Sequence, residues 1–115
     1  MRPTFALQES EQDGLVRLVL RGEVDLLAVP VLREAVTRQL DSGTVRAWEI
    51  DLSGATFLDS SGVGALLECR RTVRAAGWPY RVVNATGPVA YVLELTGVAQ
   101  LLTDEAPPPA PAGTG

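Results

Sequence analysis

The chain has 115 residues, 46% of them hydrophobic, and a formal net charge of −4, which is enough for one domain with a core of its own. Its ten basic residues are all arginine and it has no histidine, which excludes Ser–His, Cys–His and Ser–Lys catalytic pairs within the chain. The net negative charge disfavours a nucleic-acid partner. Cys69 is the single cysteine, so an internal disulfide is excluded, and without histidine a zinc site is not expected.

Membrane and secretion signals are absent from the sequence. No apolar run reaches the roughly 18 residues of a membrane span, and the first residues lack the apolar core of a signal peptide. We therefore expect a cytoplasmic protein with no membrane partner. Because no set of residues can act together as nucleophile, base and orienting group, we expect no enzymatic activity, cofactor or bound metal.

The first third of the chain predicts a hairpin and a helix. Residues 14–21, GLVRLVLR, place apolar side chains on one face and arginines on the other, which indicates a strand. Residues 4–8 are expected to pair with it as an edge strand, across a polar ESEQDG turn. Apolar residues then recur at helical spacing over 29–40, where Pro30 suits the first turn and Gly43 can end the helix.

The middle of the chain predicts a central strand and a second helix. RAWEIDLSG alternates apolar and charged residues, so we expect a strand over 48–52, followed by a loop over 53–58. We interpret Trp48 as a core residue and expect Glu49 to reach a sheet edge or an arginine. Helical spacing then runs from Ser61 and stops at Gly77.

The last elements are short. YRVVNA at 80–85 indicates an apolar strand, and Pro88 and Gly97 frame a third helix. VAQLL at 98–102 is expected to add a last short strand.

The end of the chain changes composition. EAPPPAPAGTG cannot support a helix or a strand ladder, so we expect one domain over residues 1–104 and a disordered or polyproline-like tail over 105–115. Strands and helices alternate after the initial hairpin. This order predicts an α/β fold with a mixed, largely parallel sheet of four to five strands and helices packed on it.

The segment FLDSSGVG lies between the central strand and the second helix, at the sheet edge where open α/β folds place functional groups. We expect Ser60 to be the N-cap, accepting from the amide of Gly62 or Val63. Asp59 adds negative charge near the positive end of the helix dipole. A capped helix start needs no further function, so a purely structural role stays open here. G-x-G without a third glycine or a lysine is a weak nucleotide-binding signal.

Three longer stretches carry a resemblance to a known family. LVLRGEVDLLAVPVLREAV, IDLSGATFLDSSGVGALLECRR and RVVNATGPVAYVLELTGVAQLL, in this order, resemble the bacterial anti-sigma factor antagonists, which are STAS domains. The resemblance spans roughly residues 14–102. Its hallmarks are the turn Gly22-Glu23-Val24-Asp25, the strand end Asp51-Leu52-Ser53, the segment Asp59-Ser60-Ser61-Gly62 and the helix ending Leu95-Thr96-Gly97. The Pro-rich tail replaces the further C-terminal helix with which this family often continues.

The resemblance implies partner switching in transcription regulation. It implies that the unphosphorylated chain binds an anti-sigma factor, an ATP-dependent serine kinase, and thereby frees a sigma factor. Phosphorylation of Ser60 by that kinase would release the partner, and a PP2C-type phosphatase would reset the cycle. Asp59, Ser61 and Gly62 would flank the site as partner-binding residues, and Asp25 is expected on the same edge.

Two other functions stay open from the sequence. The second hypothesis, after the phosphorylation switch, is a non-switching STAS module, in a scaffold or as an accessory subunit of lipid transport. A nucleotide-sensing STAS domain is the other alternative.

Overall fold

The computed structural model describes residues 5–103. Within this range, strands and helices follow one another in the order β1 (Phe5–Gln12), β2 (Leu15–Val24), α1 (Ala28–Ser42), β3 (Ala47–Leu58), α2 (Ser60–Ala75), β4 (Tyr80–Val83), α3 (Gly87–Leu95) and α4 (Ala99–Thr103).

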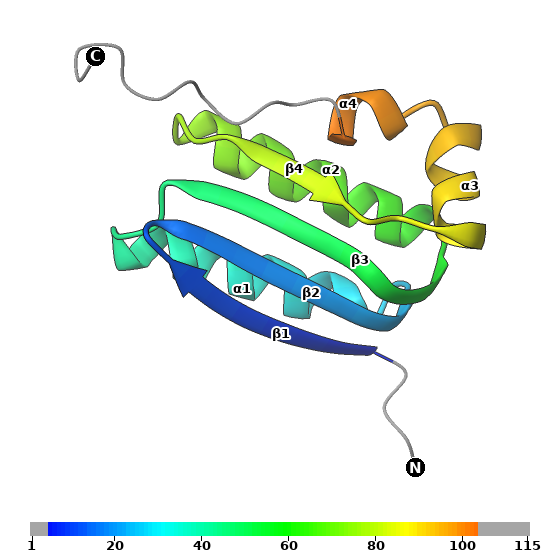
Figure 1. The fold of residues 1–115 in the computed structure, drawn as a ribbon, viewed down its shortest axis with the longest axis horizontal. Helices are drawn as coiled ribbons and strands as arrows, with labels where there is room; N and C mark the ends of the chain where they lie inside the picture. Colours follow the sequence, from blue (N-terminus) through cyan, green and yellow to red (C-terminus); the bar gives the residue numbers. More distant parts are fainter. Residues whose placement is uncertain (1–4, 104–115) are drawn as a thin grey trace.

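The strands form one mixed sheet in the order β1-β2-β3-β4 (Figure 1). β1 pairs with β2 in antiparallel fashion, whereas β2 pairs with β3 and β3 with β4 in parallel. The parallel pairs need crossover helices, which α1 and α2 supply on the same side of the sheet. The predicted α/β class with a largely parallel sheet is confirmed.

The N-terminal hairpin is longer and tighter than predicted. β1 extends to Gln12, and the turn shrinks from ESEQDG to Asp13 and Gly14, both at positive φ (55° and 85°). A two-residue turn with positive φ matches the twist of paired strands. The added strand residues also contact α1: Glu9 accepts hydrogen bonds of 2.8–2.9 Å from Arg38 and Gln39.

The predicted loop over residues 53–58 is wrong, because these residues continue β3 to Leu58. The residues SGAT have low strand propensity. They are nevertheless in a strand because β2 is long enough to pair with β3 as far as Val24 and Leu58. Register shifts between Val19 and Arg21 and between Gly22 and Glu23 accommodate the extra length. The long β3 carries the chain directly to the segment DSSG.

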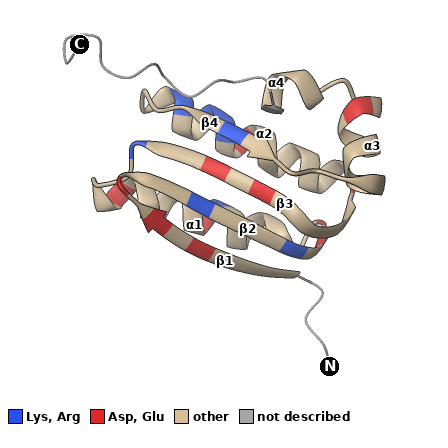
Figure 2. Ribbon diagram, viewed as in Figure 1, with Lys and Arg blue, Asp and Glu red and all other residues tan. Residues whose placement is uncertain are grey.

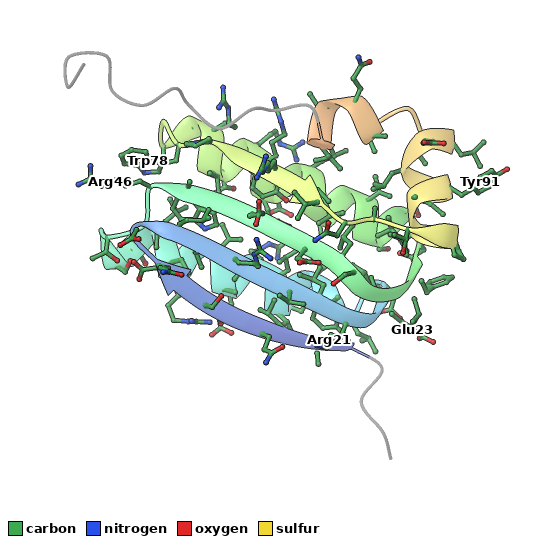
Figure 3. The ribbon with its side chains drawn as sticks, in the orientation of Figure 1. Arg21, Glu23, Arg46, Trp78 and Tyr91 are labelled. Carbon is green, nitrogen blue, oxygen red and sulfur yellow. The ribbon has the colours of Figure 1, made fainter. Side chains whose placement is uncertain are left out.

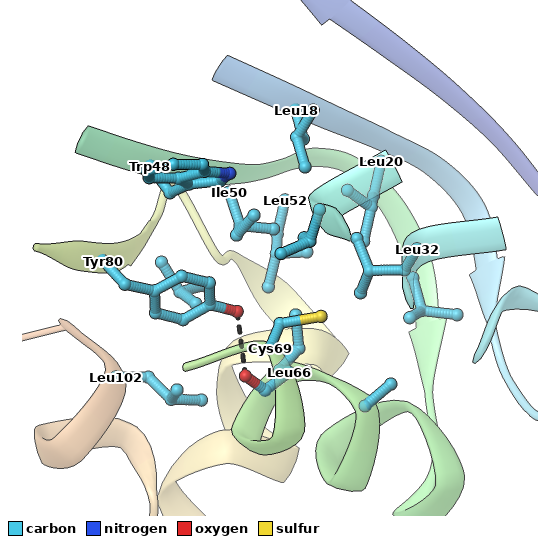
Figure 4. Close-up of a cluster of buried hydrophobic side chains, with 14 of the residues drawn as sticks. Leu18, Leu20, Leu32, Trp48, Ile50, Leu52, Leu66, Cys69, Tyr80 and Leu102 are labelled. Carbon is cyan, nitrogen blue, oxygen red and sulfur yellow. Dashed lines mark hydrogen bonds between the residues drawn. The ribbon is translucent and has the colours of Figure 1, made fainter. Parts of the chain in front are cut away.

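The core lies between the sheet and the helices α1 and α2 (Figure 4). Trp48 is 1% exposed, as predicted. The hydroxyl of Tyr80 donates a buried hydrogen bond of 2.9 Å to the carbonyl oxygen of Leu66, which ties β4 to α2. Cys69 is buried in the same core, and this burial raises the pKa of its thiol to about 12.

The predicted last strand, VAQLL, is also wrong. Residues Ala99–Thr103 form the short helix α4, and the sheet of the described residues ends at β4. Val98 and Leu102 are four residues apart, and the amide of Leu102 donates to the carbonyl of Val98 (3.0 Å). Leu102 is fully buried while Leu101 is 46% exposed. Helical spacing therefore places Leu102 in the core, on the same side as Val98, which packs against that core.

The other face of the sheet carries no helix in Figure 1 and is covered by an ionic cluster. Glu49 and Asp51 of β3 point to this face, yet they are only 3% and 5% exposed. Arg17 lies 2.6 Å from one carboxylate oxygen of Glu49, and Arg81 donates two hydrogen bonds of 3.0 and 2.7 Å to the other. Figure 2 shows these charges side by side across three strands. The expectation that Glu49 reaches an arginine is confirmed.

The predicted Pro-rich tail, residues 105–115, lies outside the described residues. Across residues 5–103, no helix combines the length and the apolar character that crossing a membrane requires.

Candidate functional site

The segment DSSG lies at the carboxyl end of the parallel strands. Val24 and Leu58 are the last paired residues of β2 and β3, so Asp25 and Asp59 follow at the same edge, each directly after the end of its strand. Asp59 then leads into α2, and Asp25 leads into α1. The two predicted partner-binding aspartates therefore come from the same edge of the sheet, as expected.

Asp59, rather than Ser60, caps α2. The backbone of Asp59 is extended (φ −114°, ψ −173°), and its Oδ1 accepts a hydrogen bond of 3.0 Å from the amide of Gly62. Its carbonyl oxygen accepts from the amide of Val63 (2.9 Å). The prediction that Ser60 is the N-cap is wrong by one residue, because β3 runs up to Leu58 and leaves only Asp59 between strand and helix.

The hydroxyl of Ser60 is free of the capping role, because Asp59 performs it. Ser60 is the first residue of α2 and is exposed, whereas Ser61 is partly buried and Gly62 is buried. Since Asp59 provides the cap, the fold does not use the Ser60 hydroxyl for capping. The positive end of the α2 dipole lies at this residue. An anion attached to Ser60 would therefore lie where helix N-termini favour negative charge.

Gly62 allows the two aspartate-bearing loops to approach each other. A methyl group built on Gly62 would overlap the carbonyl oxygen of Val24 and a methyl group of Leu58. A methyl group on Gly64 would meet no atom within 4 Å. Gly62 is therefore required for close packing between α2 and the end of β2, and Gly64 is not.

Asp25 stabilises the start of α1 through hydrogen bonds similar to those of Asp59 at α2. Its Oδ1 accepts from the amide of Leu27 and its carbonyl oxygen from the amide of Ala28, both at 3.0 Å. Leu27, the N-cap position itself, makes no side-chain capping bond. Asp25 thus has a structural role at the same edge as Asp59.

Exposed apolar side chains at this edge were not part of the predicted site. Leu26 is 67% exposed, Leu27 72% and Phe57, at the end of β3, 46%. The signal in the sequence is the pair of leucines directly after the strand-ending Asp25, where a turn would ordinarily be polar. Figure 3 shows Glu23 and Tyr91 pointing outward at this end of the molecule. The surface near Ser60 therefore combines carboxylates with exposed apolar groups.

Comparison with known proteins agrees with this architecture. The family model described as "Mlab, STAS domain" matches residues 7–103. The chain therefore belongs to the STAS domain family, and it is similar to the bacterial anti-sigma factor antagonists. The anti-sigma F factor antagonist of Lysinibacillus sphaericus is 31% identical over 100 residues, which cover 87% of this chain and 85% of that protein.

Two solved structures that carry the name SpoIIAA are similar in fold. The anti-sigma factor antagonist SpoIIAA in its unphosphorylated form is 28% identical, with a TM-score of 0.69, over 82% of this chain and 83% of that one. The phosphorylated form of the Bacillus cell fate determinant SpoIIAA is 26% identical, with a TM-score of 0.65, over 88% of this chain and 91% of that one. One of these structures is thus of an unphosphorylated form and the other of a phosphorylated form.

Proposed function

We propose that this chain is an anti-sigma factor antagonist that is switched by phosphorylation of Ser60. Unphosphorylated, it binds an anti-sigma factor that is also an ATP-dependent serine kinase, and a sigma factor is freed. Phosphorylated, it releases that partner until a PP2C-type phosphatase removes the phosphate. The observation that carries the proposal is the exposed Ser60 at the first position of α2, with Asp59 and not Ser60 capping the helix.

The local charges support such a switch without refolding. A phosphoserine adds about −1.5 to −2 charges, which the N-terminus of α2 tolerates. The same group lies next to Asp59 and at the same edge as Asp25, so it concentrates negative charge on the contact surface. Each factor of ten in affinity corresponds to about 1.4 kcal/mol, and repulsion plus desolvation at an interface supplies several times that amount.

The exposed apolar groups support a protein partner. Leu26, Leu27 and Phe57 present apolar surface at the edge that carries Ser60, and an apolar centre with a polar rim is typical of protein interfaces. A protein partner in the cytoplasm fits a chain that regulates by binding rather than by its own catalysis. Asp25, Asp59, Ser61 and Gly62 are proposed as the residues around which this partner docks.

The test uses an anti-sigma factor kinase from the same organism with ATP and Mg²⁺. Mass spectrometry is expected to find one phosphate on Ser60 and none on the Ser60→Ala variant, while Ser61→Ala is still modified. Ser60→Asp is expected to bind the kinase at least about a hundredfold more weakly than Ser60→Ala. Phosphate found only at other residues, or equal binding by Ser60→Asp and Ser60→Ala, would contradict the switch and favour a non-switching STAS module.

A second variant tests the surface rather than the switch. Leu27→Ser removes a 72% exposed apolar side chain directly before α1. We expect stability to change by no more than about 0.5 kcal/mol while affinity for the kinase falls, measured by calorimetric titration. Unchanged affinity in this variant would place the partner away from the start of α1.

A further inference from the structure

The open face of the sheet contains a groove far along the strands from Ser60. It lies where β2, β3 and β4 begin, has a volume of about 250 Å³ and is lined mainly by Leu15, Ala47 and Pro79, with Glu49 and Arg81 beside them. The parallel strands start at this end and finish at the end that carries Ser60. The groove therefore belongs to a different surface from the proposed switch.

The described chain ends close to this groove. Helix α4 packs against β4 (Figure 1), and its buried Leu102 lies beside Tyr80 at the start of that strand (Figure 4). A four-residue strand such as β4 is only about 13 Å long. Residues 104–115 follow, and an extended polyproline segment of twelve residues reaches about 37 Å. The length is sufficient to pass the outer edge of β4 and reach the groove.

We propose that residues 104–115 dock in this groove as an extended, proline-rich segment. The stretch Pro107–Pro109 supplies apolar rings with fixed φ, which lose little conformational entropy on binding. Asp104 and Glu105 are opposite in charge to Arg81, whose side chain pairs with Glu49 on one side and is still 41% exposed above the groove. Because the segment is tethered to α4, its effective concentration is in the millimolar range, so a weak intrinsic affinity is enough.

Two other hollows of the described chain are larger than this groove and serve as control surfaces. One, of about 460 Å³, runs along the exposed side of α1 and is lined by Arg33, Glu34, Arg38 and Asp41 together with Pro30 and Thr37. The other, of about 370 Å³, is lined by residues of β4, α3 and α4, among them Val82, Glu94 and Ala99. Because neither hollow shares a lining residue with the groove, binding of the segment there would give a different pattern in the experiment.

The test places a nitroxide spin label on the full chain through Ala110→Cys. Cys69 is buried and the pKa of its thiol is raised to about 12, so the label reacts with the introduced cysteine alone. In ¹H–¹⁵N spectra we expect the amide signals of Ala47, Glu49 and Arg81 to broaden, and that of Thr37 on α1 to stay sharp. Broadening that is even over the molecule, strongest on α1, or strongest at Glu94 and Ala99 of the hollow beside α4, would overturn the proposal.

Matched variants separate docking from chance proximity. Leu15→Ser removes 39%-exposed apolar surface from the groove, and Val31→Ser removes a similar side chain, 42% exposed, from α1. We expect Leu15→Ser, or replacement of Pro107, Pro108 and Pro109 by serine, to abolish the broadening, and Val31→Ser to leave it unchanged. The tail variant keeps the test valid if Leu15→Ser unfolds the domain. Broadening that survives the tail replacement would contradict docking by the prolines.

A mixed sample decides which copy of the chain is bound. Spin-labelled chain without ¹⁵N is added to unlabelled ¹⁵N chain, so that broadening arises only between molecules. We expect sharp signals at Ala47, Glu49 and Arg81 in this sample. Broadening here would show that the segment binds a neighbouring copy and would overturn docking within one chain. None of these readouts depends on Ser60 or on a kinase.

Discussion

At the scale of single residues, the proposed site depends on two small features at the start of α2. The Asp59 carboxylate holds the first turn through the amide of Gly62, and Gly62 itself leaves room for the carbonyl of Val24. Both features fix where Ser60 stands relative to Asp25. The capping role and the switching role therefore fall on neighbouring residues, and mutation can separate them.

Substitution of Gly62 and of Gly64 by alanine is expected to change the free energy of unfolding by very different amounts. Gly62→Ala places a methyl group against the Val24 carbonyl and Leu58 and should reduce the free energy of unfolding by about 1–3 kcal/mol. Gly64→Ala meets open space and should be neutral or stabilising by up to about 1 kcal/mol, since alanine is the better helix former. Urea unfolding of both variants measures this difference. Equal stabilities would mean that the close approach of α2 to β2 is absent in solution.

Substitution at the cap is expected to separate Asp59 from Ser60. Asp59→Ala removes the acceptor for the Gly62 amide and should cost about 1 kcal/mol, whereas Asp59→Asn retains an oxygen and should cost less. Ser60→Ala should change stability by no more than about 0.5 kcal/mol. Thermal unfolding followed by circular dichroism provides the measurement. A larger loss in Ser60→Ala than in Asp59→Ala would assign the cap to Ser60 after all.

At the scale of elements, β3 performs a different task on each face. One face packs Trp48, Ile50 and Leu52 into the core, and the other holds two carboxylates under arginine side chains. Burial raises the pKa of Asp51, but hydrogen bonds from Ser53 and Asn84 and the charge of Arg17 outweigh it and hold that pKa below the ordinary 3.8. Arginines thus cover the sheet face that the helices leave open.

This cluster predicts sensitivity to acid. A carboxyl group whose pKa is lower in the folded chain binds protons more readily when unfolded, so its stabilising effect is complete above about pH 4 and is lost as the pH falls through the folded value. Urea midpoints at about pH 6 and about pH 3 should therefore differ less in Asp51→Asn than in the wild type. If both proteins lose the same stability in acid, Asp51 does not contribute to the acid sensitivity.

At the scale of the whole molecule, the fold has two layers, and α4 completes it beside β4 (Figure 1). Although α4 has only five residues, its Leu102 is fully buried. Its place in the core makes α4 part of the domain rather than an appendage. It also determines where the chain leaves the domain, and hence the groove that residues 104–115 can reach.

Two neighbouring leucines test the contribution of α4. Leu102→Ala removes a fully buried side chain and should cost about 2–5 kcal/mol. Leu101→Ala removes a side chain that is 46% exposed and should cost no more than about 0.5 kcal/mol. Unfolding in urea with one cooperative transition is the measurement. A small effect of Leu102→Ala would mean that α4 is detached from the core in solution.

The three elements that the sequence predicted wrongly share one physical cause. The strand character of residues 53–58, the short turn at Asp13-Gly14 and the helical state of residues 99–103 all depend on a neighbouring element. Local composition favours loops at SGAT and at ESEQ, and only the length of the facing strand overrides it. The leucines at 26 and 27 were missed because their exposure depends on how α1 packs.

The sequence by itself determined the class of fold, the three main helices, Trp48 as a core residue and the segment DSSG at the start of a helix, because apolar periodicity and glycine or proline signals are local. Only the tertiary structure decided that Asp59 is the cap, that Ser60 is exposed beside it, and that Asp25 lies at the same edge. The physical reason is that capping, exposure and proximity depend on strand length and register, which arise when distant segments pair.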